Sequence, residues 1–360
     1  MPTSLAAKPL FLALAALTLS YGNPALAEAP AVKYQEMAIL GDSGATGVMA
    51  DPGVFLSLTV LGNLATPRNR IESNYGSVYR ALSIPYPLSG ELPRRYLPAP
   101  KDRGQKLALN FELNTDRTFM SWGYLTGRVL GVQGENMHFF ARNGRRSEHL
   151  LDQIKQLKKT FAGQLPELTV ISLTANDFCS EAVFTDKGRE DAIRKHERNI
   201  MRALNQLRSL PTRHASAKIV FMAPLPVTKI LRSQALAEKR TLLAMDIFTC
   251  GEIRSTAHST IPGKDLAESL RRMCPAVMRT APDDEARIEK LESLFADVVK
   301  TQKEILTDFA IGAPAGKEFL YFQDSFELDL RAKDVANDCF HPSIYGHGKI
   351  AARLIDFLRK

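Results

Sequence analysis

The sequence has 360 residues but only four cysteines, and it lacks a long apolar segment beyond residue 27. No stretch there reaches the ~18 uninterrupted apolar residues of a membrane-spanning helix, so we expect no transmembrane segment in the mature chain. The cysteines do not have the spacing of a zinc site, and we expect no metal. Internal repeats, zinc fingers and basic-aromatic RNA-binding motifs are also missing, so nucleic acid is not an expected partner.

The composition that is present is typical of a globular protein, with 45% hydrophobic and 24% charged residues. The formal net charge of +8 is compatible with steering of acidic partners or with a simple solubility role, and we favour solubility. One large domain with inserts fits the length as well as two domains do. We expect a single domain over residues 28–360.

Residues 1–27 are expected to be a secretory signal peptide rather than part of the fold. Lys8 precedes the short apolar run 10–19, and Ala25 and Ala27 supply the small residues that a signal peptidase reads. Cleavage is expected after Ala27, which would give a secreted or periplasmic protein. An even number of cysteines in an exported chain favours disulfides.

Short apolar runs alternate with amphipathic segments through most of the chain. The apolar runs predict strands at 37–40, 137–141, 168–173, 218–223 and 319–322. The amphipathic segments predict helices at 121–130, 147–161, 190–208, 284–308 and 344–358. This alternation predicts an α/β fold, a three-layer α/β/α sandwich with a flavodoxin-like parallel sheet of about five strands.

Two inserts interrupt the alternation. Residues 48–118 contain many prolines and tyrosines but no clear long helix, which is typical of a lid or a substrate-binding region. Residues 227–275 read as partly helical and contain Cys250 and Cys274.

Ser43 is the first candidate for chemistry. The apolar run Met37–Leu40 predicts a buried strand, and Gly41 allows the chain to turn sharply after it. Ligands of open α/β sheets bind at the carboxyl ends of the strands, which is where this turn places Ser43. A serine attacks an ester only when a base lies within hydrogen-bond reach and another group orients that base.

The other end of the chain supplies both groups. Asp338 and His341 are three residues apart, so one tight turn can bring the carboxylate onto the imidazole. Gly144 and Asn176 each follow an apolar run that predicts a strand. A backbone N–H at Gly144 and the side-chain amide of Asn176 would then point at a developing oxyanion.

These blocks resemble the SGNH hydrolases, the GDSL-type esterases and lipases. The four blocks occur in the family's order: GDS at 41–43, Gly144, AND at 175–177 and DCFH at 338–341. The sequences NDFC at 176–179 and DCFH at 338–341 look most similar to the phospholipase-B-like members. The sequence departs from the pattern at Gly44, where an apolar residue is usual, and at Ala175, where glycine is common.

The resemblance implies a hydrolase of carboxylic esters that uses no cofactor, and the expected signal peptide implies that it is exported. Ser43 would be the nucleophile, His341 the base and Asp338 its orienting acid. The N–H groups of Ser43 and Gly144 and the amide of Asn176 would bind the oxyanion. The implied substrates are small-molecule, lipid, phospholipid or acylated-glycan esters. Acyl transfer at the same site and a non-catalytic binding module on a hydrolase scaffold are alternatives, and the oligomeric state is open.

Several of these polar residues also have structural interpretations. Ser43 could cap a helix or close a turn, and Asn176 could hydrogen-bond within its own loop. We expect structural roles for Asp42 and Asp177, because a second carboxylate beside the nucleophile would raise its pKa unhelpfully. Ser147 is expected to cap the helix that follows it.

His347 competes with His341 as the base. No carboxylate precedes His347 at the spacing of Asp338 from His341, so we expect an exposed or capping role for it. Arg145 and Arg146 lie beside the oxyanion glycine, where guanidinium groups would bind a phosphate or carboxylate of the substrate. A solvated arginine cluster is the alternative.

The cysteines are expected to form two disulfides. Cys250 and Cys274 flank one insert and are the expected first pair. Cys179 and Cys339 lie within three residues of Asn176 and His341, so a second bridge between them would join two catalytic loops.

Overall fold

The computed structural model describes residues 33–48, 50, 77–83, 92–97, 118–243, 246–255 and 264–360. The expected signal peptide and most of insert 48–118 lie outside the described residues. Within these ranges, each helix is too short or too polar to cross a membrane.

A six-stranded parallel sheet forms the centre of the described fold, and its order is β2-β3-β1-β4-β5-β8. All five predicted strands are present: β1 (Met37–Gly41), β3 (Met137–Phe139), β4 (Leu168–Ser172), β5 (Ala217–Met222) and β8 (Lys317–Phe322). These five have the flavodoxin-like order, in which the first strand lies between the second and the third. The short edge strand β2 (Arg94–Arg95) was not predicted.

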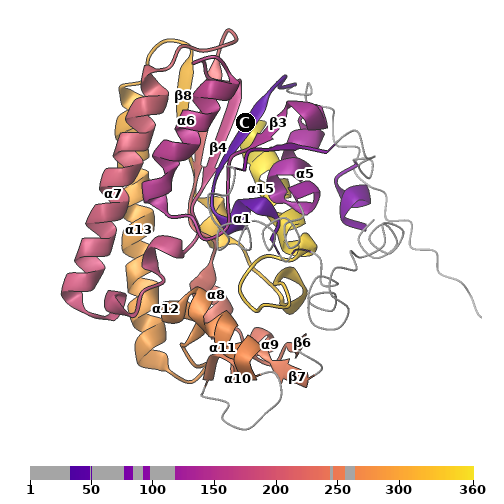
Figure 1. Ribbon diagram of the computed structural model, residues 1–360, viewed down its shortest axis with the longest axis vertical. Helices are drawn as coiled ribbons and strands as arrows, with labels where there is room; N and C mark the ends of the chain where they lie inside the picture. The colour runs from indigo at the N-terminus through magenta and orange to yellow at the C-terminus, as the bar shows by residue number, and fades with distance from the viewer. Residues whose placement is uncertain are drawn as a thin grey trace, which may run out of the picture. The chain divides into compact units, whose positions relative to one another are not determined.

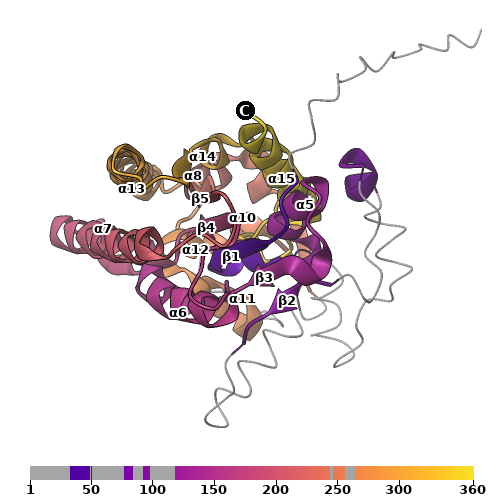
Figure 2. The same ribbon diagram turned by 90° about the horizontal axis from the view of Figure 1, so that it is seen from above.

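Apolar side chains of the strands point alternately to the two faces of the sheet, and helices cover both. Met37 and Ile39 face α5 (Trp122–Val129) and α15 (Ile344–Leu358). Ala38 and Leu40 belong to the core on the opposite face, which contains α6 (Leu150–Thr160), α7 (Asp186–Ser209) and α13 (Glu285–Ile311). Figure 2 shows these two helix layers on either side of the strands. The predicted three-layer α/β/α sandwich is confirmed.

The second insert forms a small subdomain after β5. Its helices are α8 (Val227–Arg232), α9 (Gln234–Ala237), α10 (Cys250–Ser255), α11 (Lys264–Met273) and α12 (Pro275–Met278). An antiparallel hairpin, β6 (Arg240–Leu243) and β7 (Asp246–Thr249), lies between α9 and α10. Figure 1 shows these elements together below α1, the helix that follows β1. Their apolar side chains share one core with Phe178 and Phe340, which lie in the predicted catalytic loops.

The remaining elements are short. They are α1 (Ser43–Thr46), α14 (Asp324–Glu327) and the 3₁₀ turns Thr118–Met120, Gly134–Asn136, Ser147–His149, Asn176–Phe178, Glu181–Phe184 and Ala332–Asp334.

All four cysteines form disulfides, but both predicted pairings were wrong. The bonds join Cys179 to Cys274 and Cys250 to Cys339. Both predictions fail because the insert folds onto the loops of Cys179 and Cys339 and supplies a cysteine to each. The start of α12 lies against the loop of Cys179, where the N–H of Ala276 donates to the carbonyl of Cys179 at 2.9 Å. The start of α10 lies against the loop of Cys339, with the two Cα atoms 5.5 Å apart.

Candidate active site

Ser43 is the first residue of α1, and only Asp42 separates it from the end of β1. Gly41 turns the chain before it. The φ angle of Gly41 is +133°, and a Cβ atom there would lie 1.8 Å from the carbonyl oxygen of Ser172 on β4. Glycine alone accepts both this conformation and this close approach. The turn places Ser43 between β1 and β4, where the strand order reverses and where open α/β sheets bind ligands.

Asp42 holds this turn in place. Its carboxylate caps α1 by accepting a hydrogen bond from the N–H of Gly44 at 3.0 Å. It accepts two more, both at 2.7 Å, from the N–H and the hydroxyl of Thr174. Burial raises the pKa of Asp42 to about 6, against the lowering effect of these hydrogen bonds and of the charge of His341. Asp42 therefore ties the loop after β1 to the loop after β4.

Residues 335–341, which we call the acid–base loop, bring His341 onto Ser43. Nε2 of His341 lies 2.8 Å from Oγ of Ser43, and its Nδ1 lies 2.5 Å from Oδ2 of Asp338. The second oxygen of Asp338 accepts hydrogen bonds from the N–H groups of Phe340 and His341, at 3.1 and 3.0 Å. The three side chains lie in the order nucleophile, base and carboxylate that nucleophilic catalysis uses.

Asp338 is fully buried, and its ionisation depends on His341. Burial by itself would raise the pKa of the Asp338 carboxyl, but the charge and hydrogen bonds of His341 and the N–H of Phe340 lower it below its ordinary value. The carboxylate is therefore charged at neutral pH. A charged Asp338 keeps a proton on Nδ1 of His341, which leaves Nε2 to accept the proton of Ser43.

The loop that carries Gly144 lies beside the end of β1. The N–H of Arg142 donates to the carbonyl of Gly41 at 3.2 Å, and the hydroxyl of Thr46 on α1 donates to Oδ1 of Asn143 at 2.8 Å. Gly144 has a φ of +66°, in the left-handed region, and no atom of the described residues lies within 4 Å of a Cβ built there. Its backbone conformation, rather than lack of space, favours glycine.

Asn176 lies in residues 174–179, which we call the Asn176 loop. Its Nδ2 donates to the carbonyl of Arg145 at 2.9 Å, so the Asn176 loop and the Gly144 loop are in contact. Arg145 is half-buried and Arg146 is exposed. Arg145 lines a pocket of about 520 Å³ over α6, and its other charged lining residues are Arg142, Lys155, Lys159 and the acidic Asp152. Arg146 does not line this pocket.

Asp177 organises a buried polar network behind Asn176. It accepts hydrogen bonds from the N–H and hydroxyl of Ser147, and its Oδ2 lies 2.8 Å from Nδ1 of His196 on α7. Nε2 of His196 lies 2.9 Å from Nε2 of Gln302 on α13. Burial would raise the pKa of Asp177, but His196 and Ser147 lower it overall. The prediction that Ser147 caps the helix was wrong, because its hydroxyl binds Asp177 and α6 begins only at Leu150.

The prediction of an exposed or capping His347 was wrong about exposure. His347 is fully buried on α15, and its Nδ1 accepts a hydrogen bond from the N–H of Trp122, at 3.2 Å, at the start of α5. Its Nε2 has no hydrogen-bond partner among the described residues. Burial, with a smaller contribution from the charge of His341, lowers the pKa of His347 to about 3. His347 is therefore neutral, and it caps α5 by accepting the N–H of the first residue of that helix.

Two features of the site were not predicted from the sequence. These are the hydrogen bond from Trp122 to α1 and the lack of space for a side chain at position 44. The indole N–H of Trp122 donates to the carbonyl of Gly44 at 2.9 Å, which fixes α1 against α5. A Cβ at Gly44 would lie 2.3 Å from Cγ2 of Thr174, so the apolar residue that is common at this position does not fit here. No sequence pattern marks either contact.

The described residues contain no group of three or more His, Cys, Asp or Glu side chains that could hold a metal ion. The groups that meet at the site, Ser43, His341 and Asp338, are joined by hydrogen bonds suited to proton transfer, and the Gly144 and Asn176 loops lie beside them.

Comparison with known proteins gives one decisive match. The model of the family GDSL-like lipase/acylhydrolase matches residues 39–354. No curated protein was found to match the sequence. Among solved structures, a gut microbial diltiazem-metabolizing enzyme is 10% identical, with a TM-score of 0.39 and an alignment covering 91% of this chain and 47% of that one. This chain thus spans about half of that protein's length, and so weak a likeness carries no argument. The family match covers most of the chain, and the chain belongs to the GDSL-like lipase/acylhydrolase family.

Proposed function

We propose that this protein is an exported serine hydrolase that cleaves carboxylic esters with Ser43, His341 and Asp338. The observation that supports this most is the hydrogen-bonded chain from Oγ of Ser43 through His341 to Asp338, with distances of 2.8 and 2.5 Å. Ser43 attacks the ester carbonyl while Nε2 of His341 takes its proton, and His341 then returns the proton to the leaving alcohol. Water, activated in the same way, hydrolyses the acyl-enzyme. Asp338 stabilises the imidazolium that forms.

The oxyanion would be bound by three donors: the N–H groups of Ser43 and Gly144 and the side-chain amide of Asn176. The contact between Asn176 and Arg145 supports this, because it places the amide next to the Gly144 loop. An asparagine amide has two N–H donors. One binds the carbonyl of Arg145, and the other is assigned to the oxyanion.

We further propose that residues 1–27 direct export, and that residues 28–360 form one hydrolase domain with insert 48–118 as a lid or substrate-binding region. Two disulfides support an oxidising compartment. The proposed substrates are small-molecule, lipid or acylated-glycan esters. Similarity of the NDFC and DCFH blocks to phospholipase-B-like members favours phospholipids among them.

The test is turnover of p-nitrophenyl esters of graded chain length, with a phospholipid and an acetylated xylan alongside. Ser43→Ala and His341→Ala should each lower kcat by about 10⁴-fold or more while the thermal unfolding midpoint stays close to that of the wild type. Products formed with an added acceptor alcohol would show acyl transfer instead of hydrolysis. No turnover by the wild type, or wild-type turnover by Ser43→Ala, would overturn the proposal.

A further inference from the structure

The acid–base loop contains very little regular structure, yet it must hold His341 within hydrogen-bond distance of Ser43. Ala336 organises its interior: its N–H donates to the carbonyl of His341 at 2.7 Å, and its own carbonyl accepts from the N–H of Cys339 at 3.1 Å. Cys339 has a φ of +64°, a left-handed conformation that costs a non-glycine residue free energy. A turn of this kind keeps its shape only when surrounding groups hold it.

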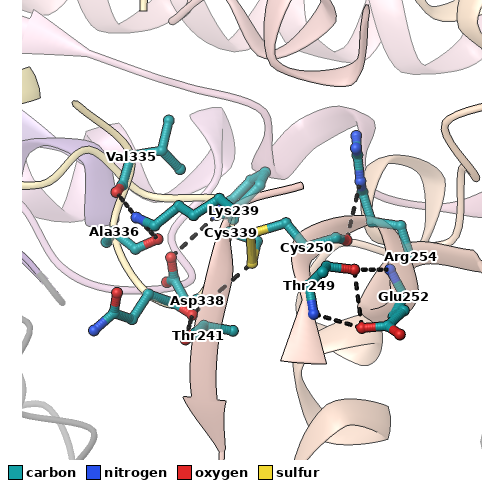
Figure 3. The surroundings of a disulfide bond; sticks show 12 residues. Lys239, Thr241, Thr249, Cys250, Glu252, Arg254, Val335, Ala336, Asp338 and Cys339 are labelled. Carbon is teal, nitrogen blue, oxygen red and sulfur yellow. Dashed lines mark hydrogen bonds between the residues drawn. A yellow bond between two sulfur atoms is a disulfide. The ribbon is translucent and has the colours of Figure 1, made fainter. Parts of the chain in front are cut away.

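Those groups come from the insert. The backbone N–H of Cys250 donates to the carbonyl of Lys239 at 2.9 Å, so the two residues lie side by side where the β6–β7 hairpin meets α10. Figure 3 shows both side chains reaching the acid–base loop, Cys250 through its disulfide to Cys339 and Lys239 through its ammonium group. The hydroxyl of Thr241 on β6 donates to the carbonyl of Asn337 at 2.7 Å.

Lys239 makes the central contact of this set. Its Nζ donates to the carbonyl of Val335 and, at 3.1 Å, to that of Ala336, the residue that organises the turn. An ammonium group bound to carbonyls makes charge-assisted hydrogen bonds, which are about twice as strong as neutral ones. The two carbonyls precede Asp338 by three and two residues. The contact therefore fixes the backbone that leads directly into the proposed catalytic acid.

We propose that Lys239 is a positioning residue of the proposed active site: its ammonium group holds the acid–base loop so that Asp338 and His341 stay in line with Ser43. Lys239 does not touch the reacting atoms and acts only through the loop. This inference rests on the proposed ester hydrolysis.

Lys239 should lose its proton within a pH range in which the enzyme can be assayed. Burial lowers its pKa to about 8, while the charges of Asp338 and Asp334 act in the opposite direction. Asp338 and Asp334 are the charged groups that face it from the loop side. The charged residues of α10, Glu252 and Arg254, lie on the far side of the disulfide in Figure 3. Above pH 8 the neutral amine would hold the carbonyls less strongly.

The experiment compares Lys239→Met, which keeps an apolar stem, with Lys239→Arg, which keeps the charge at all accessible pH values. With a neutral p-nitrophenyl ester at pH 7, Lys239→Met should lower kcat by about 10- to 100-fold with little change in KM, because misplaced catalytic groups slow the chemical step. Lys239→Arg should stay within a few-fold of the wild type. The wild-type kcat should decline near pH 8, and this decline should be absent from both variants.

With rising pH the contribution of Lys239 to the unfolding free energy should increase while kcat decreases. A purely structural lysine would change both in the same direction. Because folding lowers the pKa of Lys239, the unfolded chain binds more protons between about pH 8 and its ordinary pKa near 10.4. The unfolding free energy of the wild type relative to Lys239→Met should therefore rise through this range while the wild-type kcat falls.

Lys349 provides a matched control. Its Nζ also binds a carbonyl, that of Asp329 at 2.9 Å, together with the carboxylate of Asp334, but it does not reach residues 335–341. Lys349→Met should lower stability and leave the pH profile unchanged. An equal loss of kcat in Lys349→Met, or wild-type kcat with the alkaline decline intact in Lys239→Met, would overturn the inference.

Two further measurements complete the test. If Lys239→Met does not fold, an alkaline decline that persists unchanged in Lys239→Arg would overturn the role of Lys239. Measuring Ser43→Ala in parallel distinguishes a failure of the Lys239 inference from a failure of the proposed ester hydrolysis. An active Ser43→Ala would overturn the proposed function, whereas an inactive Ser43→Ala with an unaffected Lys239→Met would overturn only the positioning role.

Discussion

The acid–base loop and the Asn176 loop both have a cysteine bonded to the same insert, but they are held in different ways. The Asn176 loop leaves β4 directly, and Asp177 connects it to Ser147, α7 and α13 through buried hydrogen bonds. The acid–base loop begins 13 residues after the end of β8 at Phe322, and the insert holds it through Lys239, Thr241 and Cys250. The sandwich itself therefore fixes the proposed oxyanion donor, whereas the proposed acid and base depend on an added subdomain.

This difference explains why a lysine, a hydroxyl and a disulfide converge on one short segment. A loop that follows a strand inherits its position from the sheet, so few further contacts are needed. A loop far from any strand end loses more conformational entropy when it is fixed, and specific contacts must offset that cost. The insert is thus part of the proposed catalytic apparatus even though none of its residues has been assigned to the chemistry.

The largest difference in kcat between the two loops is expected when the proposed catalytic residue of each loop is replaced. Asp338→Asn should lower kcat by about 10⁴-fold, because an amide stabilises the wrong tautomer of His341. Asn176→Ala should lower kcat by about 10²- to 10³-fold, the usual loss for one oxyanion donor. Steady-state kinetics with one ester at one pH measures both. A loss in Asn176→Ala below tenfold would mean that Asn176 only binds the Arg145 carbonyl and has no part in binding the oxyanion.

The sequence predicted the sheet and its helices because each strand is a short apolar run and each helix has an apolar stripe. It also predicted that Asp338 and His341 would meet, because three residues form one turn. These are local patterns, and local geometry decides them. Whether Ser43 meets His341, 298 residues away, was inferred from the order of the family's blocks rather than from any local pattern.

The incorrect predictions all concern partners that only the tertiary fold brings together. Cys250 was paired with Cys274 because they flank one insert, but the hairpin places Cys250 against the acid–base loop. Ser147 has the residue type of a helix cap, yet a buried carboxylate on another loop takes its hydroxyl. His347 was expected to be exposed or capping because no carboxylate precedes it at the spacing of Asp338 from His341. The glycine beside it lets α15 pack closely, since a Cβ at Gly348 would lie 2.8 Å from Cγ1 of Val78.

The two disulfides allow a controlled comparison of the acid–base loop with the Asn176 loop, because they enclose chain segments of nearly equal length. The cysteines are separated by 95 and 89 residues. In the chain-entropy model each therefore contributes a similar stabilisation, about 4–5 kcal/mol. Replacing either pair by serine should lower the thermal unfolding midpoint to a similar extent.

Activity should distinguish the pairs. Without the Cys250–Cys339 bond, the left-handed turn between Asp338 and His341 loses one of its supports, and kcat should fall about tenfold at a temperature well below unfolding. Without the Cys179–Cys274 bond, the Asp177 network still holds the Asn176 loop, and kcat should change less than threefold. Equal losses of kcat would show that the insert supports both loops alike.

The smallest expected effect concerns the arginines beside Gly144, which have no counterpart in the acid–base loop. The hydrogen bond from Asn176 fixes the backbone of Arg145 next to the proposed oxyanion site, and its half-buried side chain lines the basic pocket over α6. Arg146 is exposed and does not line this pocket. An anionic group of a substrate would therefore interact mainly with Arg145, and partly exposed ion pairs contribute about 0.2–1 kcal/mol each.

Replacing Arg145 and Arg146 together with Gln should raise KM for an anionic ester by about two- to fivefold, the range that this free energy allows. KM for a neutral p-nitrophenyl ester should stay nearly unchanged. Arg145→Gln alone should account for most of the effect, and Arg146→Gln alone for little. Rising ionic strength should reproduce part of the loss in the wild type, because salt screens exposed charges within about 10 Å at 0.1 M. Equal changes for the anionic and neutral esters would assign the arginines to the solvated surface, and the charge of the substrate would then have to be recognised elsewhere.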